Sequence, residues 1–343
     1  MRKLTAVAGI LLIALAGCRG TSPDEASSGA GNETIKIMVG GIDKVIYLPA
    51  KLTEQLGGFK SEGLNVQLLT EPSGATAENV LISGDVQGVV GFYDHTIDLQ
   101  TKGKCITSVV QFADVPGEVE IVAASKAATI KSPADFKGRK LGVTSSGSST
   151  DFLTQYLATK GGLTGADYTK VKAGAGQTFI SEIDNGGIDA GMTTDPTAAK
   201  LLSTGKGKVL LDMRTEAGTR AALGGLYPAS SLYMDCAWVQ AHPAQVQKLA
   251  NALVKTLRWI KAHTPAEVAA KMPAEYAAGD PALYTKAVGD SIGMFNGDGL
   301  MKADGAKNVL EVLSQFSPNV KGKKDQIDLT KTYTTEYAAK VAS

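Results

Sequence analysis

A hydroxyl-rich loop is the segment whose residue types and spacing best suit chemistry with an anion. It follows a predicted strand over residues 140–144, opens a predicted helix over residues 150–160 and contains Gly147. Its hydroxyl side chains are Ser145, Ser146, Ser148, Ser149 and Thr150. Hydroxyl groups, free backbone N–H groups and the dipole of a helix start all favour a bound anion. A solvated turn with one capping serine would use the same residues, but α/β sheets bind ligands at this end of their strands.

An acidic residue follows another strand of the same half of the chain. Asp195 comes between Thr194 and Pro196, after a predicted strand over residues 188–193. Its carboxylate can cap the helix predicted over residues 196–203, or it can face an amine or ring N–H of a ligand. One side chain can serve both purposes, so both interpretations stay open. We include Thr194 and Asp195 among the candidate ligand-binding residues.

The preceding half carries an aromatic and polar loop after its equivalent strand. Phe92 and Tyr93 are suited to form the wall of a ligand pocket, and Asp94 and His95 are suited to polar contacts. For His95 alone, a structural hydrogen bond is the safer expectation. Two further candidates occupy a helix start and a strand-end loop of this half: Tyr47 and Ser73. A role for Tyr47 in core packing fits the sequence equally well.

Composition excludes several classes of protein. The 343 residues carry 35 basic and 34 acidic side chains, and this balance gives no electrostatic signature for nucleic acid. The sequence contains no P-loop, dinucleotide-binding, serine-hydrolase or zinc-protease motif, and its three histidines lack the spacing of a metal site. We therefore predict no enzyme activity, no cofactor and no metal. Cys105 and Cys236 are expected to be buried free thiols, with pairing outside the cytoplasm as the alternative.

The N-terminal segment predicts export from the cytoplasm. Residues 1–17 combine a basic start with an apolar run that is too short to span a bilayer. Small residues precede Cys18, as in a bacterial lipobox, and this pattern predicts a lipid on the thiol. An ordinary signal peptide with a chance cysteine is the alternative. Residues 18–33 are predicted to be a flexible linker, and the protein to be anchored to a membrane in the periplasm or at the cell surface.

The chain contains two similar halves. Residues 35–110 and 139–212 share hydrophobic and glycine positions; Gly57, for example, recurs as Gly161. Each half alternates predicted strands with helices, which indicates a parallel sheet with helices on its faces. Either a duplication or shared βαβ syntax would produce two similar α/β units.

Two extended segments connect the halves. Residues 118–125 lead from the first half to the second and residues 231–239 lead back, so the two crossings together would form a hinge. The remaining chain is predicted to be helical. Its helices include one opened by Pro243, one opened by a capping box at residues 264–267 and a last one over residues 329–342.

These features together resemble the substrate-binding proteins of ABC importers, in particular the sulfonate, nitrate and taurine group. The resemblance rests on the lipobox, the serine-rich loop and four further segments, at residues 47–50, 83–86, 132–143 and 192–196. It implies an α/β bilobal periplasmic-binding-protein fold with a helical C-terminal tail. Lobe 1 would comprise residues 34–118 and 241–343, and lobe 2 residues 119–240. The resemblance further implies a monomer that binds its ligand between the lobes and delivers it to the membrane subunits of an ABC permease.

The resemblance also implies how a ligand is held. Members of the group grip an oxyanion with Ser and Thr hydroxyls, which correspond here to the loop at residues 145–150. Several have a tryptophan where this chain has Thr194, so an aromatic wall is missing and Phe92 and Tyr93 would compensate. We expect an anionic or zwitterionic organic solute, such as a sulfonate, a taurine-like molecule or a carboxylate. The alternatives are a protein that binds a thiamine-precursor pyrimidine, a pyrimidine-synthase-like enzyme of the same fold, and a lipoprotein that serves a sensor.

Overall fold

The computed structural model describes residues 34–341. The predicted signal peptide at residues 1–17, the linker at residues 18–33 and the lipidation site at Cys18 lie outside these described residues. Within residues 34–341, no helix combines the length and apolar character that a membrane span requires.

The first sheet has five strands in the order β2, β1, β3, β10 and β4. Their bounds are Asn65–Thr70 (β2), Thr34–Val39 (β1), Gly88–Phe92 (β3), Ser230–Asp235 (β10) and Ile106–Gln111 (β4). β1 pairs in parallel with β2 and β3, whereas β10 pairs antiparallel with β3 and β4. Every residue of β3 is buried, which fits a short apolar strand covered on both faces.

The second sheet repeats this plan, which confirms the prediction of two similar α/β units. Its order is β7, β6, β8, β5 and β9. The bounds are Thr169–Lys172 (β7), Lys140–Val143 (β6), Ala190–Thr194 (β8), Glu118–Ala123 (β5) and Gly207–Asp212 (β9). β5 runs antiparallel to both of its neighbours. The expected parallel pairing is present in each sheet, but each sheet also contains one antiparallel strand from a crossing segment, so both sheets are mixed.

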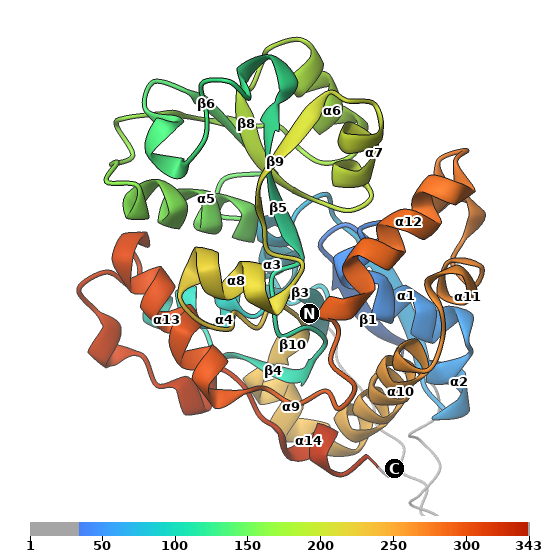
Figure 1. Cartoon of the computed structure of the whole chain (residues 1–343). Helices are drawn as coiled ribbons and strands as arrows, with labels where there is room; N and C mark the ends of the chain where they lie inside the picture. The colour runs from blue at the N-terminus through green and yellow to red at the C-terminus, as the bar shows by residue number, and fades with distance from the viewer. Residues whose placement is uncertain (1–33, 342–343) are drawn as a thin grey trace, which may run out of the picture. The chain divides into compact units, whose positions relative to one another are not determined.

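The two crossing segments are themselves these antiparallel strands. The chain leaves the first sheet after β4 and enters the second as β5, and it leaves the second after β9 and returns to the first as β10 (Figure 1). Since β10 pairs with β3 and β4, the return to lobe 1 is complete by Ser230. The sequence had placed that boundary at residue 240, too late to include β10 in the first sheet.

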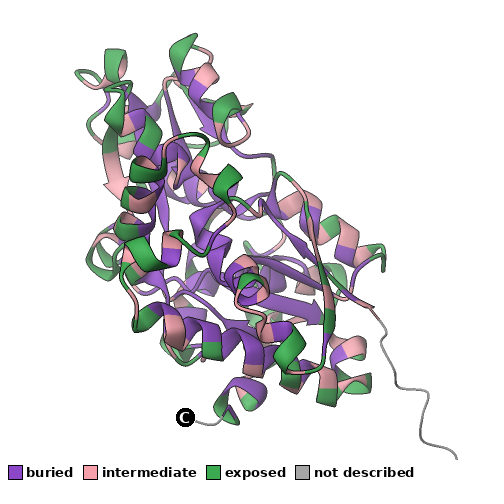
Figure 2. Cartoon of the chain, turned by 90° about the vertical axis from the view of Figure 1, so that its right-hand side faces the viewer, coloured by how far each residue is buried: buried purple, intermediate pink, exposed green. Residues whose placement is uncertain are grey.

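Helices fill the connections between strands and form the C-terminal third. They are α1 (Leu48–Gln55), α2 (Gly58–Ser61), α3 (Gly74–Ile82), α4 (Asp94–Asp98), α5 (Ser149–Lys160), α6 (Gln177–Asp184), α7 (Thr197–Ser203), α8 (Glu216–Leu223), α9 (Cys236–Ala241), α10 (Pro243–Lys261), α11 (Pro265–Ala269), α12 (Pro281–Ser291), α13 (Ala303–Phe316) and α14 (Glu336–Ala339). The predicted start at Pro243 and the capping box of Thr264 with Glu267 are confirmed. Figure 2 shows the central strands and the helix sides that face them as buried.

The predicted last helix over residues 329–342 is wrong. Only Leu329–Lys331 and Glu336–Ala339 are helical in this stretch. The residues between them extend along β4, where the N–H of Thr334 donates to the carbonyl of Ser108 at 2.9 Å. A run of β-branched threonines favours this extended backbone over a helix.

The C-terminal helices reach both lobes. α12 packs against α7 of lobe 2 and against the short turn Val45–Tyr47 (η1) of lobe 1. α13 packs against α4 of lobe 1 and α5 of lobe 2, and the rings of Phe152 and Phe316 lie 6.0 Å apart between centroids. The C-terminal region therefore connects the two lobes at two places.

Cys105 and Cys236 form a disulfide, which corrects the expectation of free thiols. Cys105 directly precedes β4 and Cys236 directly follows β10, and these two strands are neighbours in the first sheet. Their pairing brings the two Cα atoms to 5.5 Å, within the range that a disulfide requires. The spacing of the cysteines in the sequence could not reveal this, because it depends on the insertion of β10 beside β4.

Removing the disulfide is expected to lower the free energy of unfolding by about 2–4 kcal/mol. The bond joins residues separated by 131 positions, so it restricts the unfolded chain strongly. Urea denaturation of the wild type and of the double variant C105S/C236S measures the difference, and reductant should move the wild type to the value of the variant. Equal stability of the oxidised wild type and the double variant would contradict the expectation.

Candidate functional site

A small pocket lies between the two sheets, at the ends of their strands where ligands bind in α/β folds. Its volume is about 20 Å³, the space of about one water molecule. The wall is formed by Lys44, Ile46, Tyr47, Gly74, Glu118, Thr144, Ser148, Ser149, Thr150, Ala175, Thr193 and Thr194. We call it the cleft pocket. Both lobes contribute to it, and five of the residues selected from the sequence lie in its wall: Tyr47, Ser148, Ser149, Thr150 and Thr194.

The hydroxyl-rich loop folds into a compact start of α5. The hydroxyl of Ser148 lies 2.7 Å from the carbonyl oxygen of Ser145 and 2.7 Å from Oγ1 of Thr150, and Oγ1 of Thr150 accepts from the N–H of Thr144 at 2.9 Å. These internal bonds fix the loop so that the first turn of α5 faces the cleft pocket. Ser146, by contrast, is exposed and lies outside the pocket wall.

Hydrogen bonds join the two lobes beside this pocket. Oγ of Ser145 donates to Oγ of Ser73 at 2.9 Å, and Oγ of Ser149 donates to Oδ1 of Asp94 at 2.9 Å. Ser73 also caps α3, where its hydroxyl accepts from the N–H of Thr76. Ser73, Asp94 and Ser145, all selected from the sequence, thus hold the two lobes together next to the pocket wall.

Asp94 is completely buried and receives hydrogen bonds on both carboxylate oxygens. Oδ1 accepts from Ser149, and Oδ2 accepts from the hydroxyl of Tyr227 at 2.9 Å. Burial raises the pKa of Asp94, and the neighbouring His95 and these hydrogen bonds oppose that increase. A buried carboxylate with two donors is a positioned group, and it orients Ser149 in the pocket wall.

His95 is paired with Glu78 and directs its other nitrogen toward the start of α3. Nδ1 of His95 lies 2.6 Å from Oε2 of Glu78. Burial alone would lower the pKa of His95, but the negative charges of Glu78 and Asp94 raise it to about 9. Nε2 has no hydrogen-bond partner among residues 34–341, and a side chain in place of Gly74 would meet it at 2.9 Å. The ion pair supports the expected structural role, while Nε2 stays near the pocket wall.

Glu118 is the most informative residue that sequence reasoning missed. It is 2 % exposed and lines the cleft pocket from β5. Burial, reinforced by Asp94, raises the pKa of Glu118 well above its ordinary value, and Oε2 has no hydrogen-bond partner in the described part of the chain. No signal in the sequence indicated this, because glutamates that alternate with apolar residues predict a half-exposed strand, whereas every residue of β5 is buried.

Lys44 is the cation of the pocket wall. Its Nζ donates to the carbonyl oxygens of Gly40 at 2.7 Å and Pro72 at 3.1 Å. Burial lowers the pKa of Lys44 to about 8, although the nearby carboxylates of Asp43 and Glu118 oppose the decrease. The pocket therefore presents an ammonium group from Lys44 and a carboxyl group from Glu118 whose raised pKa favours the protonated form.

Asp195, a favoured candidate, does not belong to the pocket wall. Its Oδ1 accepts from the N–H of Ala199 at 3.0 Å, and its Oδ2 lies 3.0 Å from Nη1 of Arg214 and 2.7 Å from Oγ of Ser291 in α12. Its carbonyl oxygen accepts from the N–H of Val45 at 3.0 Å. The carboxylate thus accepts from the first turn of α7, whose N-cap is Pro196 and not Asp195. It also connects lobe 2 to α12 through Ser291.

Removing the Ser291 hydroxyl is expected to lower the free energy of unfolding by about 1.5–3 kcal/mol, since that hydroxyl donates to a buried carboxylate. The S291A variant tests this in thermal or urea unfolding. S314A is the control, because its exposed hydroxyl bonds only to a carbonyl of its own helix. A loss no larger than that of S314A would show that Arg214 alone satisfies Oδ2 of Asp195.

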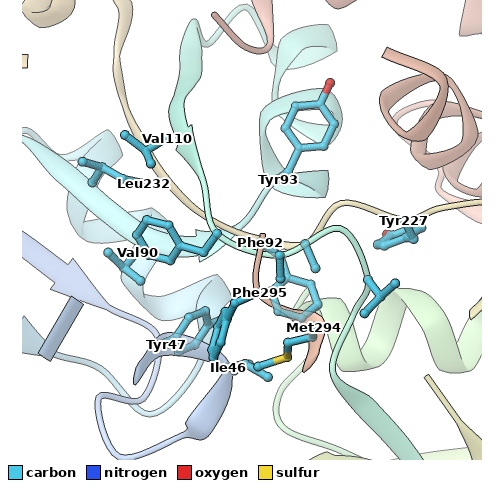
Figure 3. Close-up of a cluster of buried hydrophobic side chains, with 14 of the residues drawn as sticks. Ile46, Tyr47, Val90, Phe92, Tyr93, Val110, Tyr227, Leu232, Met294 and Phe295 are labelled. Atoms are coloured by element: carbon cyan, nitrogen blue, oxygen red, sulfur yellow. The ribbon is translucent and has the colours of Figure 1, made fainter. Parts of the chain in front are cut away.

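The aromatic candidates divide between two places. Tyr47 lines the cleft pocket and packs edge-on against the buried ring of Phe92, with centroids 6.3 Å apart. Tyr93 points away from this pair, as Figure 3 shows, and its hydroxyl lies 2.6 Å from Oγ1 of Thr332 in the C-terminal segment. Tyr93 therefore anchors the C-terminal segment, and Phe92 supports Tyr47 from behind.

Comparisons with known proteins place this geometry in a family. A solved structure of a protein from Bordetella bronchiseptica RB50 is 35% identical, with a TM-score of 0.85 and coverage of 89% of this chain and 96% of that chain. The alkanesulfonate-binding protein from Xanthomonas axonopodis pv. citri, solved with MOPS, is 16% identical with a TM-score of 0.72, and the match covers 90% of this chain and all of that one (100%). That likeness shows the bilobal periplasmic-binding-protein fold.

A curated relative has a different description. The 4-amino-5-hydroxymethyl-2-methylpyrimidine phosphate synthase of Aspergillus parasiticus is 27% identical over 232 residues, and the chain spans 64% of that relative's length. A family model described as NMT1/THI5 like matches residues 48–267. This match covers more than half of the chain and includes every strand of both sheets except β1. The protein therefore belongs to the NMT1/THI5-like family.

Proposed function

We propose that this protein is an extracytoplasmic solute-binding lipoprotein that captures a small zwitterionic or amine-bearing organic molecule in the cleft. Anchored through Cys18, it delivers the molecule to an ABC permease as a monomer. One observation carries the proposed ligand chemistry: a buried carboxylate with an unsatisfied oxygen within residues 34–341 and the first turn of a helix line the same pocket.

Two features of the pocket wall are suited to different ligand groups. Oε2 of Glu118 is suited to accept a hydrogen bond from an ammonium or amine N–H, because a buried acceptor without a donor is costly. The first turn of α5, with Ser149 and Thr150 in the pocket wall, is suited to hold carboxylate or sulfonate oxygens. A ligand with an amine and an oxyanion satisfies both, and a simple inorganic anion leaves Glu118 unsatisfied.

Binding of such a ligand requires the lobes to separate. A volume of about 20 Å³ is far below the several hundred Å³ of ordinary ligand pockets. The bonds from Ser145 to Ser73, from Ser149 to Asp94 and from Val45 to Asp195 join the lobes around the pocket. We infer that these three hydrogen bonds break together when the ligand enters. When the lobes close on the ligand, the same groups form hydrogen bonds again, with partners that differ from the present ones.

A pyrimidine-phosphate-synthase-like enzyme is the second candidate. The curated relative supports it, and so does Nε2 of His95, which has no hydrogen-bond partner in the described residues and lies 4.0 Å from Oδ1 of Asp94. An aminopyrimidine would also offer N–H donors to Glu118. The two candidates differ in outcome, because a binding protein returns its ligand unchanged.

Native mass spectrometry followed by a thermal-shift screen tests the proposal. The panel contains taurine-like zwitterions, simple sulfonates, carboxylates, alkylamines and aminopyrimidines. A ligand present at 100 times its Kd stabilises the folded state by about 2.7 kcal/mol. Stabilisation by zwitterions or amines, with the compound recovered unchanged, supports the proposal. Equal stabilisation by simple anions would overturn the role of Glu118, and a chemically altered compound would favour the enzyme.

A further inference from the structure

A second and larger pocket lies where lobe 2 meets the C-terminal helices. Its volume is about 300 Å³, compared with about 20 Å³ for the cleft pocket. Residues of α6 and α7 form one side, the segment from Glu275 to Tyr284 forms the other, and Asp43 of lobe 1 completes it. We call it the outer pocket. None of the candidates selected from the sequence lies in its wall.

The backbone of the two lobes separates the outer pocket from the cleft pocket. Asp43 and Pro196 line the outer pocket, whereas their close chain neighbours Lys44 and Thr194 line the cleft pocket. Between them, the N–H of Val45 donates to the carbonyl of Asp195 at 3.0 Å. Among the described residues, the two walls have no member in common. The outer pocket is thus separate from the cleft pocket and not an extension of it.

The wall of the outer pocket combines aromatic rings with negative charge. Tyr276 and Tyr284 belong to it, and Tyr284 is 4 % exposed. Of the described residues in the wall, Asp43, Glu275 and Asp280 carry carboxylates and Lys200 carries the ammonium. Burial, with the carboxylate of Asp43 adding to it, raises the pKa of Tyr276 to about 12 and also raises the pKa of Tyr284. Both rings are therefore close to the charge of Asp43.

One residue of the pocket wall has a backbone conformation that residues other than glycine rarely adopt. Ala278 has a φ of 46°, in the left-handed region, and it lines the pocket between the short turn Ala274–Ala277 and α12. A residue with a Cβ keeps such a conformation only where its surroundings fix it, and such positions are concentrated at ligand sites. The segment that carries Tyr276 is thus fixed in shape.

We propose that the outer pocket is a second binding site, for a small organic cation with an aromatic or aliphatic body. Aromatic rings attract a cation through their π-electrons. The wall has more carboxylates than ammonium groups, and this negative charge attracts a cation as well. The apolar body is accommodated by the rings and by Leu283 and Ile180. Because the wall is drawn from lobe 2, lobe 1 and α12, an occupant stabilises the arrangement in which these parts are in contact.

A pair of matched probes tests this site: phenethylamine, which is a cation at neutral pH, and 2-phenylethanol, which is its neutral counterpart. NMR spectra of the isotope-labelled protein follow each titration at millimolar concentrations. We expect the cation to shift the signals of Tyr276, Ala278 and Lys200. We expect the alcohol to bind at least about tenfold more weakly, which corresponds to the loss of about 1.4 kcal/mol of charge attraction.

Two variants make the test specific. Tyr276→Ala is expected to weaken the binding of both probes, and Asp43→Asn only that of the cation; if Tyr276→Ala fails to fold, Asp43→Asn carries the test alone. Shifts confined to the cleft pocket, no shifts at all, or equal affinity for the two probes would overturn the proposal. Glu118→Gln must leave the shifts at the outer pocket unchanged, so a failure of the proposed cleft ligand is distinguishable from a failure of this site.

Discussion

Glu120→Gln is expected to make the protein more stable than the wild type at pH 8 and nearly equal to it at pH 4. Glu120 is 0 % exposed, and neither of its carboxylate oxygens has a hydrogen-bond partner within residues 34–341. Burial raises the pKa of Glu120 from its ordinary value of 4.5 to about 8. The folded protein therefore holds this proton across a pH range in which the unfolded chain releases it.

The sign of the effect follows from this difference in proton binding. The protonated carboxyl is fully compatible with the fold below pH 4.5, and its contribution to stability is lost as the pH rises toward 8. The loss amounts to about 1.4 kcal/mol per pH unit, or about 5 kcal/mol over the whole range. Glutamine is isosteric with the protonated carboxyl and does not ionise. The variant therefore does not lose this stability as the pH rises.

Urea denaturation at several pH values between 4 and 8.5 measures the free energy of unfolding of the wild type and of the variant. Groups that both proteins share contribute equally, so the way in which the difference between the two free energies changes with pH reflects Glu120. The exposed Glu216, whose side chain is 60 % accessible, supplies the control variant Glu216→Gln. A difference between wild type and Glu120→Gln that does not change with pH would show that Glu120 titrates normally in the folded protein.

Glu118→Gln is expected to weaken binding of the proposed zwitterionic or amine-bearing ligand by at least about thirtyfold. Loss of one partner of a buried charged hydrogen bond costs about 2–5 kcal/mol. Burial and the negative charges of Asp94 and Glu120 raise the pKa of Glu118, and the positive charges of Lys44 and His95 oppose that increase. A bound ammonium group must therefore displace a proton from Glu118. Affinity should therefore rise with pH in the wild type and lose this dependence in the variant.

Isothermal titration in buffers of different ionisation enthalpy detects the released proton, once a ligand is known. Glu120→Gln is the matched control, because Glu120 lies two residues away on the same strand and outside the wall of the cleft pocket. Both variants lose a buried carboxyl. Because Glu120 raises the pKa of Glu118, Glu120→Gln should change affinity far less than Glu118→Gln and in the opposite direction. Equal affinity of Glu118→Gln and Glu120→Gln would rule out an ion pair between Glu118 and the ligand.

The sequence predicted the architecture well because the architecture follows from local patterns. Alternating strands and helices, the offset at which Gly57 recurs as Gly161 and the crossing segments all depend on short-range hydrophobic periodicity. The hydroxyl-rich loop was found for the same reason, since its position between β6 and α5 is a property of neighbouring residues. The C-terminal stretch lacks such a pattern, and its extended part depends on contact with Ser108, more than two hundred residues earlier.

The composition of the site was harder to predict because it depends on partners distant in the sequence. Asp195 was expected either to cap a helix or to face a ligand, but Arg214 and Ser291 bind its carboxylate, and nothing near Asp195 in the chain indicates Ser291. Glu118 was read only as part of a crossing, because its isolation from donors becomes visible only when both lobes are assembled. Tyr227, which orients Asp94, lies in an irregular segment without a motif.

The return of β10 to the first sheet fixes the order in which the two sheets can be completed during synthesis. The first sheet cannot close until Asp235 has been made, because β10 separates β3 from β4. Until then the edges of β3 and β4 present unpaired N–H and C=O groups, which are open to association with other chains. The second sheet has all of its strands once Asp212 is made. The second sheet, which begins later in the chain, can therefore be completed first. The first sheet is completed only after β10 has been synthesised.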